Sequence, residues 1–328
     1  MKLFPSQKKK TRNRVKGLTL REFHQKSQEL LLVREVGGLG DILMHRMMFE
    51  DIKKQYPDMY IKYACPRHYH SVVEDHPYID ELLESRDLDL KDYLVTYNTT
   101  TACREYECMM APYSGKHRSD IWANHIGVEL SNHDMHLSLD EESLEYGRRT
   151  IKEYRCGHEG PSVAFCPISA MLIKDLNAEQ QKGTVEHLRK RGCFVFGLHT
   201  DPVAPLSEVG VPVLLNQGLR EWMGLLSAAD YVVAVDSAPT HFAGGIGKPQ
   251  VAIFTFADGK VYGKYYKNFI LVQKHRDNGD WDCGPCYNYI RCPKETDYPK
   301  PCLTEITVEM IADGIDTMLK KYPMNTTV

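Results

Sequence analysis

Two successive series of short apolar runs, each run followed by a helical pattern, constrain the fold of this chain more than any other feature. The first series opens at residues 30–33, where an apolar run is closed by glycines and followed by apolar residues at helical spacing over 42–54. The second series opens at 162–166 and repeats the pattern. Apolar runs of this length that alternate with helices are typical of parallel strands buried on both faces. The sequence therefore predicts an α/β fold with two Rossmann-like, doubly wound domains.

The order of these patterns predicts where the elements and domains lie. Strands are expected at residues 30–36, 59–65, 79–83, 93–97, 162–166, 193–198, 211–215, 231–235 and 251–254. Helices are expected at 42–54, 72–74, 119–127, 178–192, 219–229, 238–247 and 306–321, and the polar stretch 131–161 is interpreted as the connection between the halves. This organisation divides the chain into a basic tail at 1–19, domains at 20–155 and 156–305, and a terminal helix at 306–328.

The chain is large enough for both domains, and its N-terminus is basic. Its 328 residues exceed what one ordinary core accommodates. No run of 18 apolar residues and no apolar segment near the N-terminus is present, so we expect neither a membrane-spanning helix nor a secretory signal, and we place the protein in the cytoplasm. Seven of the first 16 residues are Lys or Arg. They form either a solvated tail or an arm that contacts something anionic, such as nucleic acid, a phosphorylated acceptor molecule or a membrane surface.

The first candidate ligand site is the sequence GGLGD at residues 37–41. Glycines directly after a strand allow a tight turn, and Gly40 is expected to bring its amide close to a ligand at the start of the following helix. The spacing differs from G-x-G-x-x-G, and no acidic residue follows the second strand to bind a ribose, which argues against a dinucleotide site. Asp41 is predicted either to face a ligand at the carboxyl edge of the sheet or to cap its helix.

The second candidate site is VDSAPTHFAGGIGKP at residues 235–249. Asp236 and Ser237 are expected to cap a helix that starts at Ala238. The amide groups at a helix start favour an anion, so we predict that they bind a diphosphate. His241 lies one turn further on and is expected to face the same cleft. The alternative is a buried, capped helix whose histidine fills a polar gap.

Ser169 and Lys174 form the third candidate site. They follow the strand expected at 162–166, which places them at the carboxyl edge of the second sheet. A lysine there can neutralise a departing phosphate as a point charge. The alternative interpretation is a solvated loop lysine that has no part in binding.

Four of the ten cysteines lie close together late in the chain, in the pattern C-x2-C-x5-C-x9-C. They are Cys283, Cys286, Cys292 and Cys302. In a cytosolic protein such a cluster indicates a metal site rather than disulfides, and four thiolates suit zinc or iron. Because four protein ligands leave no open coordination position, we expect a structural metal and no catalytic one. The alternative is a reduced, metal-free loop.

The motifs at residues 37–41 and 235–249 resemble those of the heptosyltransferases of glycosyltransferase family 9, which have the GT-B fold. The resemblance covers residues 30–320 and rests on GGLGDILMHRMMFEDIKKQYPDMYIKYAC, PRHYHSVVEDHPYIDEL and VDSAPTHFAGGIGKPQVAIF. It implies two Rossmann-like domains that face each other across a cleft, with the acceptor side in the N-terminal domain and the nucleotide-sugar site in the C-terminal domain. The chain departs from the family pattern at 46–48, where a proline is usual, and at Ala238, where a glycine is common.

The resemblance also implies roles for individual residues. Asp41 corresponds to the catalytic base of the family. Asp236, Ser237 and His241 correspond to residues that contact the donor nucleotide and its diphosphate, and Lys174 corresponds to the lysine after the first strand of the second half. Some relatives that glycosylate proteins carry a late cysteine finger that holds iron.

Together these features predict an inverting glycosyltransferase that moves a sugar from a nucleotide-diphosphate donor, ADP-heptose or a similar molecule, to an acceptor hydroxyl. The acceptor can be a glycolipid, a protein or a modified nucleic acid, and the basic tail favours an anionic one. A homo-oligomer is compatible with the sequence. The alternatives are a non-catalytic protein that binds nucleotide-sugars, and a Rossmann oxidoreductase, which the missing dinucleotide motif disfavours.

Overall fold

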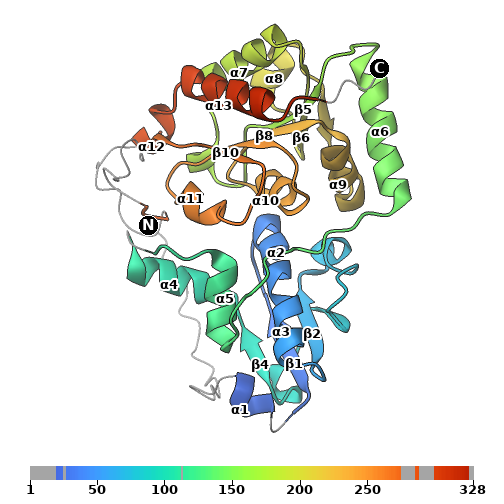
Figure 1. Cartoon of the computed structure of the whole chain (residues 1–328), viewed down its shortest axis with the longest axis vertical. Helices are drawn as coiled ribbons and strands as arrows, with labels where there is room; N and C mark the ends of the chain where they lie inside the picture. The colour runs from blue at the N-terminus through green and yellow to red at the C-terminus, as the bar shows by residue number, and fades with distance from the viewer. Residues whose placement is uncertain (1–19, 25–26, 112–113, 275–284, 288–298, 325–328) are drawn as a thin grey trace, which may run out of the picture.

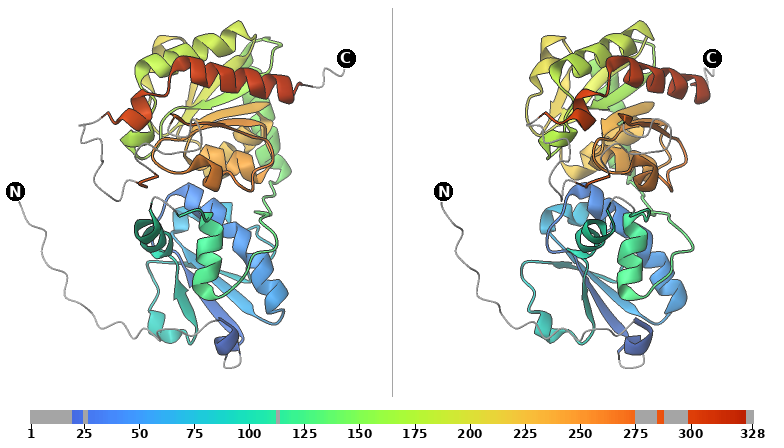
Figure 2. Two further views of the ribbon diagram at one scale, coloured as in Figure 1. Left: turned by 60° about the vertical axis from the view of Figure 1, so that its left-hand side comes forward. Right: turned by 90° about the vertical axis from the view of Figure 1, so that its left-hand side faces the viewer.

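Each half of the chain forms one parallel β-sheet, and the two sheets lie in separate lobes stacked along the long axis of the molecule (Figures 1 and 2). This computed structural model describes residues 20–24, 27–111, 114–274, 285–287 and 299–324. The first sheet has the strand order β3-β2-β1-β4 and the second has the order β10-β9-β8-β5-β6-β7. Neighbouring strands are parallel in both. The predicted α/β fold is therefore confirmed.

The first lobe follows the predicted pattern with small shifts, but its helices at 20–24 and 102–110 were not predicted. Its strands are β1 (Glu29–Val33), β2 (Tyr60–Cys65), β3 (Glu81–Glu84) and β4 (Thr96–Asn98). Its helices are α1 (Leu20–His24), α2 (Leu39–His45), α3 (Phe49–Gln55), α4 (Ala102–Met110) and α5 (Arg118–Ile126), with the 3-10 helices η1 (Arg46–Met48), η2 (Arg67–Val72) and η3 (Leu90–Asp92). The helix expected at 42–54 is present as α2 and α3, joined by η1. The short helix expected at 72–74 instead lies earlier, as η2.

The second lobe is the larger one. Its strands are β5 (Ser162–Cys166), β6 (Phe194–His199), β7 (Val213–Leu215), β8 (Tyr231–Val235), β9 (Gln250–Ile253) and β10 (Phe269–Val272). Its helices are α7 (Ala178–Lys190), α8 (Ala204–Glu208), α9 (Leu219–Ala228), α10 (Ala238–Gly245), α11 (Gly259–Tyr262), α12 (Pro301–Thr304) and α13 (Val308–Lys321), with the 3-10 helix η4 (Leu172–Lys174). The sequence predicted most of these elements, but not α8, α11, α12 or β10.

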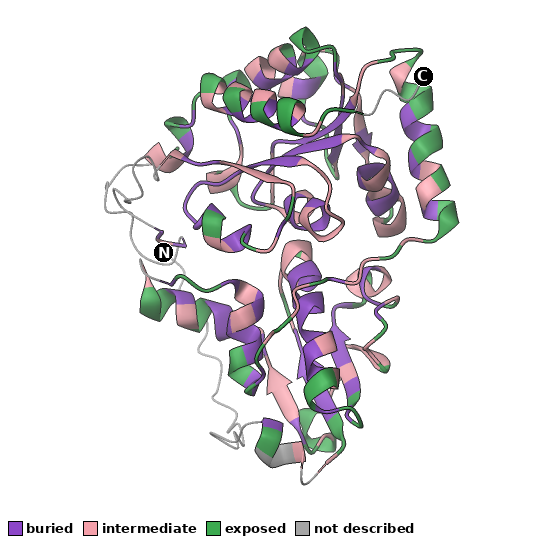
Figure 3. Cartoon of the chain, in the orientation of Figure 1, coloured by how far each residue is buried: buried purple, intermediate pink, exposed green. Residues whose placement is uncertain are grey.

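Helices cover both faces of the second sheet, as the wholly apolar strands require. β5 and β8 are buried along their entire length, and Figure 3 shows the second sheet as the buried centre of its lobe. Val163 and Phe165 pack in one apolar cluster with residues of α7 and α13. Ala164 and Cys166 face the other way and join a cluster that contains residues of α9 and α10. Alternate residues of one strand therefore bury against two helical layers.

The stretch 131–161 joins the two sheets as expected, but it contains the 15-residue helix α6 (Glu141–Arg155), which was not predicted. Hydrophobic periodicity missed this helix since its buried face is mostly small or polar, with Ser143, Gly147, Thr150 and Ile151. A Cβ at Gly147 would clash with the backbone oxygen of Gly224 in α9, so the two helices touch through glycines. The usable signal was Asp140, whose side chain caps α6.

The packing of α6 bears on where the two domains divide. α6 lies against α9 of the second lobe, on the outer side seen in Figure 1. The domain ranges 20–155 and 156–305 stay predictions, and we propose that the division lies before Asp140. Of the helices in the described segments, none has the length and apolarity to cross a membrane.

Candidate active site

Asp41 is the centre of a partly buried ion-pair cluster at the carboxyl edge of the first sheet. It lies in the first turn of α2, after β1. Arg34 Nη2 donates to its Oδ2 at 2.6 Å, and Arg118 Nη1 donates to its Oδ1 at 2.7 Å. The N-cap of α2 is Gly38, and no described side chain caps this helix. Of the two roles considered for Asp41, capping is therefore wrong.

The two arginines decide the charge of Asp41. Burial alone would raise the pKa of this carboxyl, but the charges of Arg118 and Arg34 outweigh it and lower the pKa from its ordinary 3.8 to about 2. Asp41 is consequently ionised throughout the neutral range. It can accept a proton, although it is a weak base.

Sequence reasoning missed both arginines. Arg34 follows β1, and its Nη1 donates to the backbone oxygens of Thr99 and Thr100. Arg118 opens α5, 77 positions after Asp41. Its Nε and Nη2 donate to the two carboxylate oxygens of Glu107 in α4, at 2.8 and 2.9 Å. No local motif marks Arg118 or Glu107, so only the tertiary contacts identify them.

A second ion cluster lies at the carboxyl edge of the second sheet, where β8 leads into α10. Asp236 is 3% exposed, and its Oδ2 lies 2.8 Å from Lys174 Nζ. Its Oδ1 lies 3.5 Å from His241 Nε2. Burial raises the pKa of Asp236, but Lys174 and His241 lower it further, so that the net shift is downward. The structure thus brings Lys174 together with Asp236 and His241, which the sequence had placed on a separate segment.

The start of α10 is not capped as expected. Ser237 is the N-cap, yet no described side chain hydrogen-bonds to the first amides of this helix. The Ser237 hydroxyl donates instead to the backbone oxygen of Val235 at 2.9 Å, and Thr240 Oγ1 donates to the same oxygen at 2.8 Å. Asp236 is directed to Lys174, so the predicted capping by Asp236 and Ser237 is wrong. The helix start from Ala238 therefore keeps its capacity to bind an anion.

Ser169 lies in the same loop as Lys174 but has local partners. Its amide and its hydroxyl donate to Asp175 Oδ1 at 2.7 and 3.1 Å, and the hydroxyl also lies 3.1 Å from the backbone oxygen of Met171. These bonds shape the turn that carries Lys174 toward Asp236. The Ser169 side chain therefore stabilises the turn that carries Lys174.

The two ion clusters meet where the lobes touch, between α2 and α10 (Figure 1). A Cβ at Gly40 would lie 2.6 Å from Cδ2 of His241, so only glycine permits this approach. The other side of the His241 ring is held by Tyr266, whose hydroxyl lies 2.8 Å from Nδ1. Asp41 follows Gly40, and its carboxyl is close enough to His241 for the histidine to contribute to the lowering of its pKa.

Comparison with known proteins agrees with this arrangement. A model of glycosyltransferase family 9 (heptosyltransferase) matches residues 116–282, slightly more than half of the chain. The chain belongs to glycosyltransferase family 9. This membership makes the protein an enzyme and confirms the resemblance that its motifs indicated. A comparison with proteins of curated function found no match.

Solved structures of other glycosyltransferases share the fold of this family 9 enzyme. The family 9 glycosyl transferase of Veillonella parvula has a TM-score of 0.68 at 17% identity, over 89% of this chain and 97% of that chain. The ADP-heptose lps heptosyltransferase II of E. coli has a TM-score of 0.61 at 13% identity, over 89% and 99%. The iron-containing dodecameric glycosyltransferase TibC of enterotoxigenic E. coli has a TM-score of 0.64 at 16% identity, over 89% and 76%. These similarities show that the fold is the expected GT-B fold.

Half of the predicted cysteine site of the glycosyltransferase can be placed. Cys286 and Cys302 both pack against the apolar cluster that contains Phe256 and Tyr287, so they converge on one small region. Cys283 and Cys292 lie outside the described residues. Within the described part of the chain, no group of three or more His, Cys, Asp or Glu side chains is placed to hold a metal ion. The two placed cysteines fit a shared site, but they do not by themselves define one.

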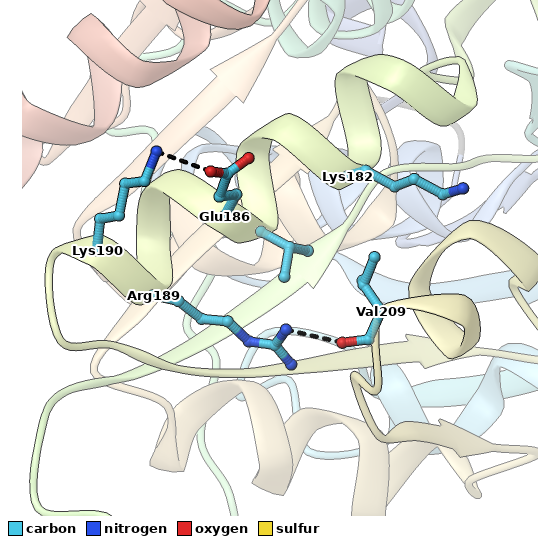
Figure 4. A pocket seen from close by; sticks show the side chains of 6 residues that line it. Lys182, Glu186, Arg189, Lys190 and Val209 are labelled. Atoms are coloured by element: carbon cyan, nitrogen blue, oxygen red, sulfur yellow. Dashed lines mark hydrogen bonds and ion pairs between the residues drawn. The ribbon is translucent and has the colours of Figure 1, made fainter.

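A surface hollow of about 490 Å³ on the second lobe is unrelated to this site. It is lined by Lys182, Val185, Glu186, Arg189, Lys190 and Val209. Figure 4 shows Lys190 paired with Glu186, while Arg189 donates to the backbone oxygen of Val209 at 2.7 Å. Lys182 pairs with Glu208 of α8. Because the lining residues belong to α7 and the segment after α8, the hollow adds nothing to the α2–α10 contact.

Proposed function

We propose that this glycosyltransferase moves a sugar from a nucleoside-diphosphate donor, ADP-heptose or a related molecule, to an acceptor hydroxyl with inversion at the anomeric carbon. One observation carries the proposal: the contact between Gly40 and His241 brings α2, which carries Asp41, against α10. A relative of the same fold, TibC, was solved in complex with ADP-D-beta-D-heptose. This supports a donor of that class.

The donor diphosphate would bind at the start of α10, close to Lys174. The helix amides from Ala238 onward and the ammonium of Lys174 supply positive potential for the leaving group. Asp236 would not touch the diphosphate, because two anions repel. Its contacts with Lys174 and His241 support a different role, which is to hold both side chains in place. Ser237 would lie against the donor through its backbone, and Ser169 would act by shaping the loop of Lys174.

Asp41 would take the proton of the acceptor hydroxyl as that oxygen attacks. The oxygen–carbon bond forms on the face opposite the diphosphate, and the bond to the diphosphate breaks with its electron pair. A carboxylate with a pKa of about 2 is a weak base, but an oxygen attached to a carbon with oxocarbenium character is far more acidic than a free alcohol. Proton transfer to Asp41 is therefore favourable in free energy once the new oxygen–carbon bond is largely formed.

The first test is Asp41→Asn, which keeps the shape of the side chain and removes its basicity. We expect donor binding, measured as thermal stabilisation by ADP-heptose and by a panel of other nucleotide-sugars, to change little. Turnover should fall by about two orders of magnitude or more. Asp316→Asn is the matched control, since Asp316 also pairs with an arginine, Arg191, but lies on α13 away from the site. Normal turnover by Asp41→Asn would refute the assignment of the base.

We also propose that Cys283, Cys286, Cys292 and Cys302 hold a structural zinc or iron ion. The support is the convergence of Cys286 and Cys302 on one apolar cluster, together with the soft ligands that four thiolates offer. TibC, which shares the fold, contains iron. The catalytic steps proposed above use no metal.

A further inference from the structure

A continuous ladder of hydrogen bonds connects Asp41 to the second lobe. Arg118 donates to Asp41 and, through two other N–H groups, to both oxygens of Glu107. Glu107 Oε1 also accepts from the hydroxyl of Tyr262 at 2.8 Å. Asp41, Arg118 and Glu107 belong to the first lobe, whereas Tyr262 ends α11 in the second. The ladder therefore crosses from one lobe to the other at a single hydroxyl group.

The ladder is shielded from solvent at the crossing. Glu107 is 1% exposed and Tyr262 is 3% exposed. The guanidinium carbon of Arg118 lies 5.0 Å from the centre of the Tyr262 ring, so the same tyrosine contacts two successive members of the ladder. Charges in such surroundings interact strongly, and a buried carboxylate oxygen that loses its donor is costly. Because Asp41, Arg118 and Glu107 alternate in charge, each side chain is held in position by its neighbour in the ladder.

Tyr262 also touches the residues on the donor side. Its ring packs edge-on against Phe254, which follows β9, with the ring centres 6.0 Å apart. The centre of the His241 ring, which belongs to the ion cluster of the second lobe, lies 6.5 Å from the centre of the Tyr262 ring. A donor that binds at the start of α10 would therefore lie close to His241, whose ring is a neighbour of Tyr262.

We propose that Tyr262 is a positioning residue that couples the donor-binding lobe to the base, by holding Glu107 and, through Glu107 and Arg118, the carboxylate of Asp41. This proposal rests on the proposed function of Asp41. When the lobes separate, Glu107 loses the hydrogen bond from the Tyr262 hydroxyl and Arg118 loses its contact with the Tyr262 ring, while the bonds of Arg118 to Glu107 and Asp41 remain within the first lobe. The base is then fully oriented only while the lobes are in contact, which restricts proton transfer to the enzyme that is closed on its donor.

The coupling is distinct from simple adhesion between the lobes, and a second tyrosine makes the distinction testable. Tyr265 donates to Asp120 Oδ2 at 2.7 Å, so it too forms a hydrogen bond from the second lobe to a carboxylate of α5. Asp120 pairs with His133 and makes no described contact with Asp41. If Tyr262 only joined the lobes, removal of its hydroxyl would affect kcat as little as removal of the Tyr265 hydroxyl. If Tyr262 positions Glu107, removal of its hydroxyl should lower kcat.

The experiment compares Tyr262→Phe with Tyr265→Phe in the full-length enzyme, with ADP-heptose as the donor and water as the acceptor, and it follows release of ADP. We expect Tyr262→Phe to lower kcat ~10-fold, the effect of weakening one interaction that is made in the reacting state. The dissociation constant of the donor should stay within about twofold, because the diphosphate site is untouched. Tyr265→Phe should keep the wild-type kcat. Equal kcat values for the two variants would overturn the proposal.

A double-mutant cycle with Glu107→Gln tests the ladder itself. If Tyr262 acts through Glu107, the double variant should lose no more activity than Glu107→Gln alone, whereas multiplicative losses contradict the coupling. If the wild-type enzyme shows no turnover, the proposed transferase function is contradicted, but the hydrogen-bond ladder through Tyr262 can still be tested. The same cycle is then read from unfolding midpoints of Tyr262→Phe, Glu107→Gln and the double variant, where additive changes would overturn the ladder.

Discussion

The ion cluster around Asp41 makes a quantitative prediction about stability and pH. A carboxyl whose pKa is lowered on folding stabilises the folded state above its unfolded pKa, and this contribution is lost as the pH falls through the folded pKa. For Asp41 the pKa falls from 3.8 to about 2. This change corresponds to ~2.4 kcal/mol of unfolding free energy at pH 7, because a tenfold change in a binding constant is worth 1.36 kcal/mol.

Replacing Asp41 by asparagine removes that dependence. At pH 3 the ionisation of Asp41 still contributes ~1.3 kcal/mol to the unfolding free energy of the wild-type protein, so about 1.1 kcal/mol is lost between pH 7 and pH 3. The asparagine variant has a constant deficit from its unpaired arginines, but it lacks this titration. The difference in unfolding free energy between the two proteins should therefore shrink by about 1 kcal/mol over this range.

The assay is urea denaturation at pH 7, 5, 4 and 3, followed by far-ultraviolet circular dichroism and by tryptophan fluorescence. Coincident transitions are needed, because two lobes can unfold separately. Asp316→Asn serves as a comparison: Asp316 is paired with Arg191 in a solvent-exposed setting, where screening makes the pH-dependent difference smaller. A wild-type advantage over Asp41→Asn that stays constant or grows toward pH 3 would refute the reasoning.

Two further predictions concern the contact between the lobes and the cysteine cluster. Gly40→Ala places a Cβ 2.6 Å from His241 Cδ2, so it should push α2 away from α10 and lower kcat about 10-fold in the same ADP-release assay. Gly38→Ala is the control, because a Cβ there meets no described atom within 4 Å and should leave kcat unchanged. Elemental analysis of the purified protein should find about one zinc or iron ion per chain. Its removal by a chelator should lower the unfolding temperature without abolishing donor binding, and a protein isolated without metal would contradict the metal site.

The sequence determined every strand except β10, the order in which these strands appear, and the edge of each sheet at which the candidate site residues lie. The apolar run of β5 can be buried only between two helical layers, and it is found there. Because parallel strands end at the same edge of a sheet, Asp41 after β1 and Asp236 after β8 could be placed at ligand-facing edges from local pattern alone. The glycine at position 40 was expected to allow the close approach of a ligand, and in the structure it allows the close approach of the His241 ring.

Only the tertiary structure decided what these residues touch. Arg118 lies 77 positions from Asp41, and Tyr262 lies 155 positions from Glu107, so no local spacing encodes either contact. α6 escaped prediction because a helix that packs through glycine needs no apolar stripe. Asp236 was expected to cap a helix, but a nearby ammonium competes more strongly for a buried carboxylate than neutral amides do. Local sequence fixes backbone geometry, whereas charge pairing depends on which segments folding brings together.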